Sequence, residues 1–131
     1  MKAVARRREG YTHDVETDDG HTIVIDELPE DGGAGLGPMP TRVLTASLAA
    51  CQAITIEMYA GRKGWELGDV VVEVNGERGE DGNPTTFDIA IRIPEEIDAD
   101  QEKQILRVAA KCPVHRILSG EVLFEARVER V

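Results

Sequence analysis

Apolar and polar positions divide the chain into short alternating segments around one long apolar stretch. In the N-terminal third, alternation broken by a turn at 18–20 (Asp-Asp-Gly) predicts three strands, at residues 3–8, 11–17 and 21–26. Residues 30–37 hold four glycines and are followed by Pro38 and Pro40, so we expect a loop there. The length of this loop indicates a role beyond connecting two elements.

The long apolar stretch predicts a helix over residues 41–63. Apolar or small residues recur at 44, 48, 51, 55 and 58, and a second row runs through 43, 47, 50 and 54. Because polar residues are scarce on most sides between 43 and 56, we expect this helix to be buried rather than laid on a surface. Its many alanines would let other backbones approach closely.

The second half of the chain predicts a hairpin, two helices and a last strand. Alternation at 69–78 and 85–93 favours antiparallel strands with one solvated face. Asp98 and Gln101 form a capping-box pattern for a helix over 99–111, and Pro113 begins a short helix over 113–119. Residues 121–128 alternate again. The order is β-β-β-α-β-β-α-α-β, an α+β class, in a single domain spanning 1–131.

Composition narrows the function. The 131 residues carry 15 basic and 25 acidic side chains, a net charge of −10. This charge disfavours general nucleic-acid binding and anionic membrane surfaces. The longest weakly polar run, 43–56, is shorter than the ~20 residues of a spanning helix, and no apolar signal segment follows the N-terminal charges. We therefore expect a cytoplasmic protein without membrane or nucleic-acid partners.

Two cysteines are the main candidates for chemistry. Cys51 lies within the apolar helix, and Cys112 directly precedes Pro113. In a reducing compartment a permanent disulfide is not expected. Free N–H groups at the start of the short helix favour a thiolate at Cys112, where His115 and Arg116 could add to the effect. Each cysteine taken alone is more typical of a small buried apolar residue than of a reactive thiol.

A metal site is an alternative use of the same cysteines. It would combine them with some of His13, His21, His115 and Asp26, but no C-x-x-C or H-x-x-x-H spacing supports zinc. A hydrogen bond of His21 to Asp26 or Glu27, and an exposed His115, are the simpler expectations. Trp65 is expected to anchor a core or an interface.

Several segments resemble one protein family. Residues 37–40 (Gly-Pro-Met-Pro) and 44–51 (Leu-Thr-Ala-Ser-Leu-Ala-Ala-Cys) resemble the central-helix motif of the OsmC/Ohr family, the osmotically induced and organic-hydroperoxide-resistance proteins. Residues 58–60 (Met-Tyr-Ala), 62–65 (Arg-Lys-Gly-Trp) and 112–116 (Cys-Pro-Val-His-Arg) are similar to its OsmC-like branch. So is His21 with Asp26-Glu27. The resemblance extends from about residue 3 to the C-terminus.

The resemblance implies an OsmC-like fold in which antiparallel sheets wrap buried central helices in an intertwined homodimer. It implies a thiol-dependent peroxidase with no metal or bound cofactor. Cys51 would attack an organic hydroperoxide and become a sulfenic acid, and Cys112 would resolve it to a disulfide. A dithiol reductant of unknown identity would restore both thiols.

The resemblance further implies that an arginine near the N-terminus lowers the pKa of the helix cysteine. Arg8, followed by Glu9 and Gly10, matches best, while Arg6 and Arg7 are rivals because a one-residue slip changes the face of a strand. The glutamate that orients this arginine in the family is missing, since Thr41 and Arg42 occupy its positions. The alternative is therefore a catalytically weak or inactive OsmC-like dimer that binds a small apolar ligand.

Overall fold

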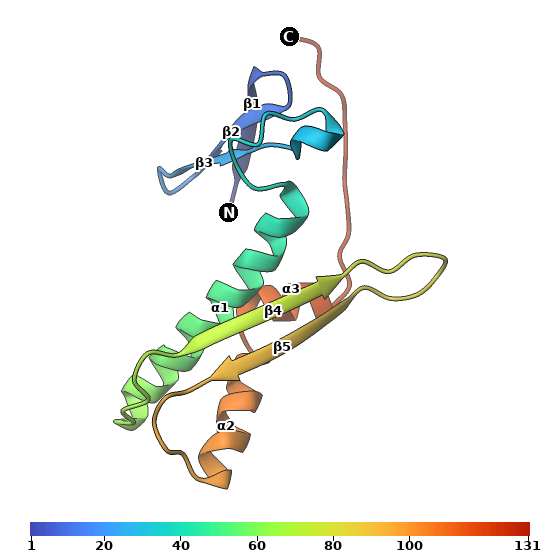
Figure 1. Ribbon diagram of the computed structural model, residues 1–131. Coiled ribbons are helices and arrows are strands. Elements are labelled where there is room, and N and C mark those ends of the chain that lie inside the picture. The colour runs from blue at the N-terminus through green and yellow to red at the C-terminus, as the bar shows by residue number, and fades with distance from the viewer. The chain divides into compact units, whose positions relative to one another are not determined.

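The computed structural model describes residues 1–131, which divide into two compact units, Met1–Ala46 and Ser47–Val131. The predicted α+β class, with antiparallel sheets and a central helix, is confirmed. The elements are β1 (Ala3–Glu9), β2 (Thr12–Thr17), β3 (Thr22–Ile25), the 3-10 helix η1 (Pro29–Asp31), α1 (Pro40–Lys63), β4 (Val71–Glu77), β5 (Thr86–Arg92), α2 (Ala99–Ala109) and α3 (Pro113–Ser119) (Figure 1).

The first unit is built on an antiparallel sheet in the order β1-β2-β3. In the main-chain register, Arg6 lies opposite Asp14 and Arg7 lies opposite His13. The register then shifts between Arg7 and Glu9. Because side chains alternate between the faces of a strand, Arg6 and Asp14 share one face of the sheet and Arg7 and His13 the other.

A buried carboxylate holds the loop between β3 and α1. Asp26 is 1% exposed and accepts hydrogen bonds from the Thr12 hydroxyl (2.7 Å) and the main-chain N–H groups of Glu27 (2.7 Å), Ala34 (3.4 Å) and Leu36 (3.2 Å). These bonds, that of Thr12 first, lower the pKa of Asp26. These hydrogen bonds therefore hold the loop in one conformation.

Two glycines of this loop lie against other main-chain segments. A Cβ atom at Gly33 would lie 2.0 Å from the carbonyl oxygen of Glu27, and one at Gly37 would lie 2.1 Å from that of Val24. Any side chain there would push the chain off the turn that Asp26 holds.

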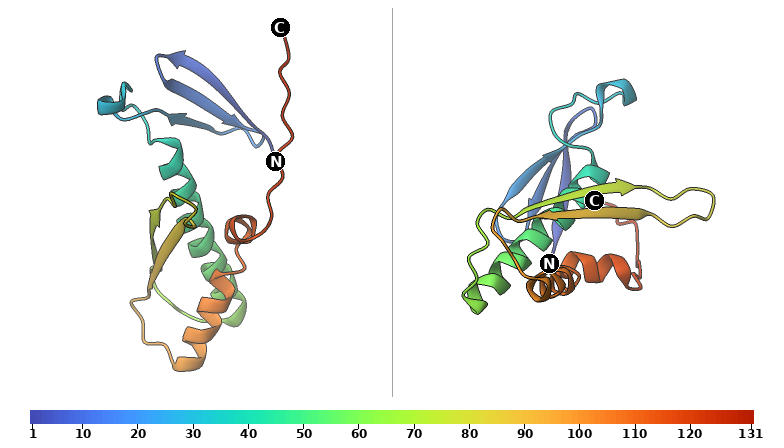
Figure 2. Two further views of the ribbon diagram at one scale, coloured as in Figure 1. Left: turned by 90° about the vertical axis from the view of Figure 1, so that its right-hand side faces the viewer. Right: turned by 60° about the horizontal axis from the view of Figure 1, so that its bottom comes forward.

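The second unit has the larger core. One row of α1, spaced four residues apart, is buried at Leu48, Gln52, Ile56 and Ala60. The hairpin of β4 and β5 lies along this part of the helix, with α2 beside it (Figures 1 and 2). The core cluster comprises Ile56, Ala60, Leu67, Ile105 and Ala109, against which Trp65, Val70, Val72, Ile91, Ile93 and Ile97 pack. The predicted role of Trp65 as a core anchor is confirmed.

The two short helices begin where the sequence predicts. Asp98 caps α2 by accepting from the N–H of Gln101 (2.7 Å), whose side chain accepts from the N–H of Asp98 (3.0 Å). Cys112 is the N-cap of α3, and Pro113 is its first residue.

The last predicted strand, 121–128, is wrong for the single chain. After α3 the chain forms no strand, and Figure 2 shows it as an irregular extended segment. Phe124 is 88% exposed and Val128 is 96% exposed. A strand requires a neighbour to satisfy its N–H and C=O groups, and no strand of the chain pairs with this segment.

The prediction that α1 is buried on most sides is also wrong for the single chain. Ile54 and Met58 are about half exposed on the side away from the buried row, and Leu44, one turn before Leu48, is about half exposed as well. By length and apolar composition alone, the helix could also cross a membrane.

Candidate functional site

The structure brings the two cysteines together within the second unit. Cys51, from the middle of α1, is half-buried, whereas Cys112, at the start of α3, is fully buried. Both are free thiols, and they are neighbours, since Cys51 contributes to raising the pKa of the Cys112 thiol. Two neighbouring reduced thiols, one half-buried and one enclosed, are suited to reversible dithiol–disulfide chemistry.

The surroundings of Cys112 do not favour the thiolate that the sequence predicts. Its Sγ accepts a hydrogen bond from the N–H of His115 (3.3 Å), as expected at a helix start. Burial nevertheless raises the pKa of the Cys112 thiol, and the adjacent Cys51 raises it further, while the N–H groups of His115 and Val114 act in the opposite direction. The thiolate prediction is therefore wrong, because desolvation outweighs the helix N-terminus.

Sequence reasoning missed Gln52, which links the two cysteine-bearing helices. This side chain is 1% exposed, and its Nε2 lies 3.3 Å from Nδ1 of His115 on α3. Its Oε1 is buried without a hydrogen-bond partner. Such an orphaned acceptor costs about 1–3 kcal/mol. The sequence signal that could have identified Gln52 is a polar residue directly after the cysteine of an apolar helix.

His115 is half-buried and paired with Gln52, so the expectation of an exposed histidine is wrong. His21 is exposed and lies 3.2 Å from Asp19, through its Nδ1, rather than at Asp26 or Glu27. That prediction fails because Asp26 is enclosed by the donors described above.

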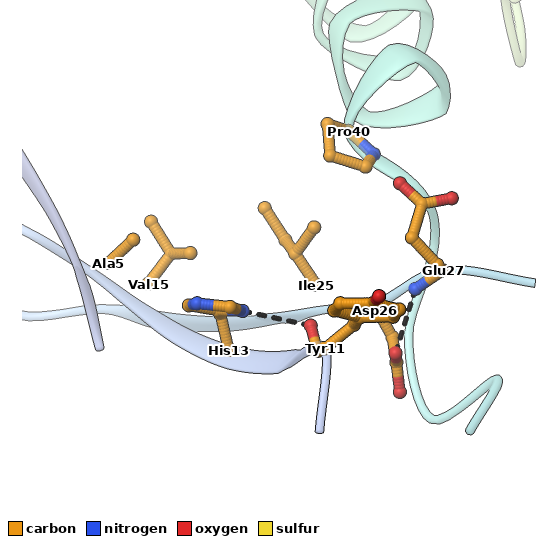
Figure 3. Close-up of a pocket in the computed structure, with 8 residues that line it drawn as sticks. All are labelled: Ala5, Tyr11, His13, Val15, Ile25, Asp26, Glu27 and Pro40. Carbon is orange, nitrogen blue, oxygen red and sulfur yellow. Dashed lines mark hydrogen bonds between the residues drawn. The ribbon is translucent and has the colours of Figure 1, made fainter. Parts of the chain in front are cut away.

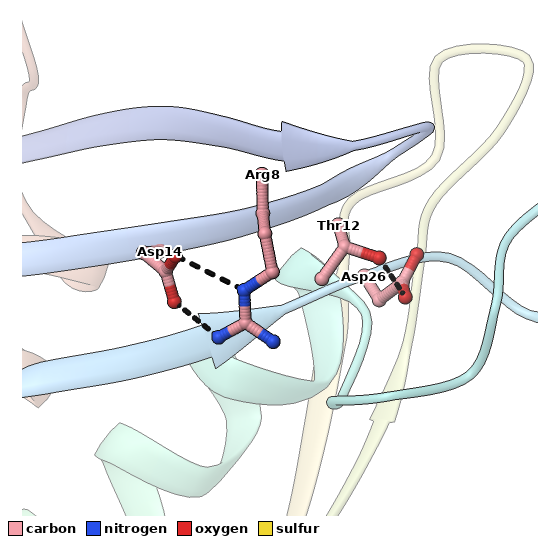
Figure 4. Close-up of polar contacts among 4 residues, drawn as sticks. All are labelled: Arg8, Thr12, Asp14 and Asp26. Carbon is pink, nitrogen blue, oxygen red and sulfur yellow. Dashed lines mark hydrogen bonds and ion pairs between the residues drawn. The ribbon is translucent and has the colours of Figure 1, made fainter.

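Arg8 lies in the first unit and Cys51 in the second, so a contact between them stays a prediction. The guanidinium of Arg8 is held by Asp14 through two bonds, Nε to Oδ2 (3.1 Å) and Nη2 to Oδ1 (2.6 Å) (Figure 4). The hydrogen bond lowers the pKa of Asp14 and raises that of Arg8. A two-point contact of this kind fixes the guanidinium plane.

The other two arginines of this strand lie differently. Arg6 pairs with Glu16 (2.7 Å), one step along the same face as Arg8 and Asp14. Arg7 pairs in register with His13 on the opposite face.

The first unit also has an apolar pocket of about 360 Å³ on the face of the sheet that carries His13 (Figure 3). This volume is in the range of small-molecule sites. The lining residues are Ala5, Tyr11, His13, Val15, Ile25, Asp26, Glu27 and Pro40. No group of three or more histidine, cysteine or acidic side chains in the chain is arranged to hold a metal ion.

Fold and site together define a small α+β protein with a central helix cysteine beside a second cysteine at a helix N-cap. The chain belongs to the OsmC family, because the family model for OsmC-like proteins matches residues 32–127. Proteins of this family are soluble, and the apolar α1 is consistent with a core helix of such a protein. A search of the curated proteins finds no match.

Solved structures share the fold at low identity. One, from Psychrobacter arcticus 273-4, is a protein named for osmotic stress induction and a detoxification response; it has a TM-score of 0.76 at 22% identity, over 88% of this chain and 86% of that one. An OsmC-like protein from Mycoplasma pneumoniae has a TM-score of 0.69 at 24% sequence identity, and the match covers 91% of this chain and 86% of that one. An organic hydroperoxide resistance protein from Legionella pneumophila has a TM-score of 0.61 at 23% sequence identity, and the match covers 92% of this chain and 90% of that one.

Proposed function

We propose that this protein is a cysteine-based peroxidase that reduces organic hydroperoxides and contributes to peroxide resistance. The observation that carries the proposal is the pairing of half-buried Cys51 with fully buried Cys112. Membership of the OsmC family supports it, as does the name of the similar Legionella pneumophila protein, organic hydroperoxide resistance protein.

The two cysteines divide the reaction between them. Burial keeps Cys112 protonated, so Cys51 is the nucleophile for the first step. Its sulfur attacks the terminal oxygen of the hydroperoxide, the O–O bond breaks, and the alcohol leaves after taking up a proton. Cys51 is then a sulfenic acid.

The second step closes a disulfide. The Cys112 sulfur attacks the Cys51 sulfur, the S–O bond breaks, and the hydroxyl leaves as water with the Cys112 proton. A dithiol reductant then exchanges with the disulfide, is itself oxidised, and restores both thiols. No metal or bound cofactor enters this cycle.

Arg8 is the residue that we propose to stabilise the Cys51 thiolate. The family's orienting glutamate is replaced by Thr41 and Arg42, but Asp14 holds Arg8 by two bonds and leaves its Nη1 free to donate. A guanidinium within about 4–6 Å of a sulfur favours the thiolate. Asp14 thus supplies the orientation for which Thr41 and Arg42 have no carboxylate.

We further propose that residues 1–131 act as one OsmC-like domain in a cytoplasmic homodimer. The exposed faces of α1 and the unpaired segment after α3 support a second copy, since monomers rarely expose so much apolar surface in one stretch.

The test of the proposed function is oxidation of the reduced protein by one equivalent of cumene hydroperoxide. We expect both thiols to be lost, with formation of alcohol and an intramolecular disulfide seen by mass spectrometry. Cys51→Ser should abolish peroxide consumption. Cys112→Ser should still react once and accumulate sulfenic acid. Persistence of both thiols, or wild-type turnover by Cys51→Ser, contradicts the proposal.

The arginine assignment has a matched comparison on the same strand. Arg8→Ala and Asp14→Asn should each lower the rate of Cys51 oxidation at pH 7 by about tenfold or more, the effect of one pKa unit. Arg6→Ala, which removes a similar ion pair, should leave the rate unchanged. The thiolate absorbance of Cys51 near 240 nm checks the cause. An effect of Arg7→Ala without one of Arg8→Ala would transfer the role to Arg7.

The apolar pocket favours a second candidate function, binding of a small apolar ligand by a weak or inactive enzyme. Mass spectrometry of the organic extract of the purified protein tests it. A stoichiometric ligand, displaced by Val15→Trp, together with inert thiols would favour this function over the peroxidase.

A further inference from the structure

The peroxidase cycle above uses neither Gln52 nor His115, although these two side chains connect the elements that carry the cysteines. Gln52 directly follows Cys51 in α1, and its Nε2 lies 3.3 Å from Nδ1 of His115. His115 also donates its main-chain N–H to Sγ of Cys112 over 3.3 Å. One peptide bond and two hydrogen bonds therefore join the two thiol residues.

Gln52 is an exception in its surroundings. The other members of the buried row of α1, Leu48, Ile56 and Ala60, are apolar. Gln52 is 1% exposed and satisfies only one end of its amide, because Oε1 has no partner. An apolar side chain of similar shape would avoid this loss. Local rules are most often broken where a residue serves function.

The two ends of the amide suit both forms of the imidazole. When Nε2 donates, Nδ1 of His115 must accept, and the ring proton lies on Nε2 of the histidine. When Nδ1 carries a proton, the amide can turn over and accept it with Oε1, the atom now without a partner. The link between α1 and α3 can therefore form with either tautomer of His115.

We propose that Gln52 and His115 are positioning residues for disulfide formation, holding the Cys112 sulfur against Cys51 once the sulfenic acid has formed. The proposal rests on the peroxidase function. In this step the S–S bond forms as the S–O bond of Cys51 breaks, and the Cys112 proton leaves in water. The hydroperoxide has already supplied the oxidising equivalents, so no other oxidant is needed. The first step does not depend on the pair.

The experiment measures the two steps separately in the reduced full chain. Stopped-flow mixing with cumene hydroperoxide gives the rate of Cys51 oxidation, and dimedone labelling gives the fraction of sulfenic acid that escapes disulfide formation. Gln52→Met keeps length and volume but removes the hydrogen bond. We expect its first step within about twofold of wild type, its disulfide formation slowed about tenfold or more, and more dimedone adduct.

Further variants separate positioning from general damage. His115→Leu, at a half-buried site, should behave like Gln52→Met, whereas His115→Asn, whose amide can occupy the place of Nδ1, should recover most of the rate. Ser119→Ala is the matched control, because its hydroxyl bonds the carbonyl of His115 (2.8 Å) without touching Gln52. In ¹⁵N NMR, Gln52→Met should lose the single histidine tautomer that the wild-type pair imposes.

A second oxidant keeps this proposal distinct from the proposed function. Diamide needs no peroxidase activity: the Cys51 sulfur adds to its N=N bond, and Cys112 then displaces the hydrazine to form the disulfide. If the wild type reacts with diamide but not with cumene hydroperoxide, the peroxidase function fails and the pair is judged from the diamide rates. Wild-type disulfide formation in both Gln52→Met and His115→Leu, or equal slowing of both steps, would overturn the positioning role.

Discussion

At the scale of single residues, the structure uses carboxylates to fix main chain and guanidinium groups. Asp26 is the clearest case: this side chain, directly after β3, accepts hydrogen bonds from a hydroxyl of β2 and from three main-chain N–H groups of the following loop. The loop leads directly into α1, so this carboxylate sets where the central helix begins.

Asp26 should make the protein sensitive to acid. Because its pKa is lowered in the folded state, its contribution to stability is complete above the unfolded value of about 3.9 and is lost as pH falls through the folded pKa. Asp26→Asn should lower the melting temperature at pH 7, since its NH₂ group meets donors, and the loss should shrink as pH falls below about 4. Differential scanning calorimetry from pH 7 to 3 measures both.

Glu30→Gln is the control, because Glu30 lies on the same loop and is exposed. It should match wild type at every pH. An Asp26→Asn deficit that stays constant down to pH 3 would show that the ionised carboxylate is not what stabilises the loop.

Residue-scale prediction from sequence found Cys51 and Cys112 but misjudged their surroundings. The N-cap of Cys112 was readable from the Cys-Pro step, whereas its complete burial depends on packing between helices that no local pattern encodes. The Gln52–His115 link depends on a contact across 63 positions, and the Arg8–Asp14 pair depends on strand register.

At the scale of elements, the sequence predicts the bounds of an element best where residues at the ends of that element form its caps or turns. α3 begins and ends where predicted, and α2 begins at the predicted capping box of Asp98 and Gln101. α1 and the five strands β1 to β5 lie within a few residues of their predicted bounds. Caps, turns and periodicity are short-range, so the sequence alone reveals them.

Elements that depend on distant partners were predicted less well. The segment 121–128 has a strand pattern, but a pattern cannot supply the neighbouring strand that hydrogen bonding requires. Likewise, α1 has apolar residues on most sides, yet in the single chain only one row is fully buried. Both differences place apolar groups in solvent, and both would be removed by a second chain.

At the scale of the whole molecule, the exposure of apolar groups on both α1 and the segment after α3 makes the oligomeric state the property to measure. The exposed apolar side chains include Leu44, Ile54 and Met58 on α1 and Val122, Leu123, Phe124 and Val128 after α3. In the last segment, Val122, Phe124 and Val128 alternate with charged residues or Leu123, as expected of a strand that adds to a sheet. Net charge of −10 keeps such a chain soluble but does not cover these groups.

We therefore expect light scattering after size exclusion to give the mass of two chains at micromolar concentration. Phe124→Asp should shift the equilibrium towards monomer by about tenfold or more, because a charge would replace an aromatic ring that the dimer would bury, and one lost contact of about 1.4 kcal/mol suffices. Val131→Asp, at the exposed end of the same segment, is the matched control and should leave the dimer intact. A wild-type monomer at every concentration, with full hydroperoxide turnover, would contradict the dimer and require the single chain to stabilise the Cys51 thiolate by itself.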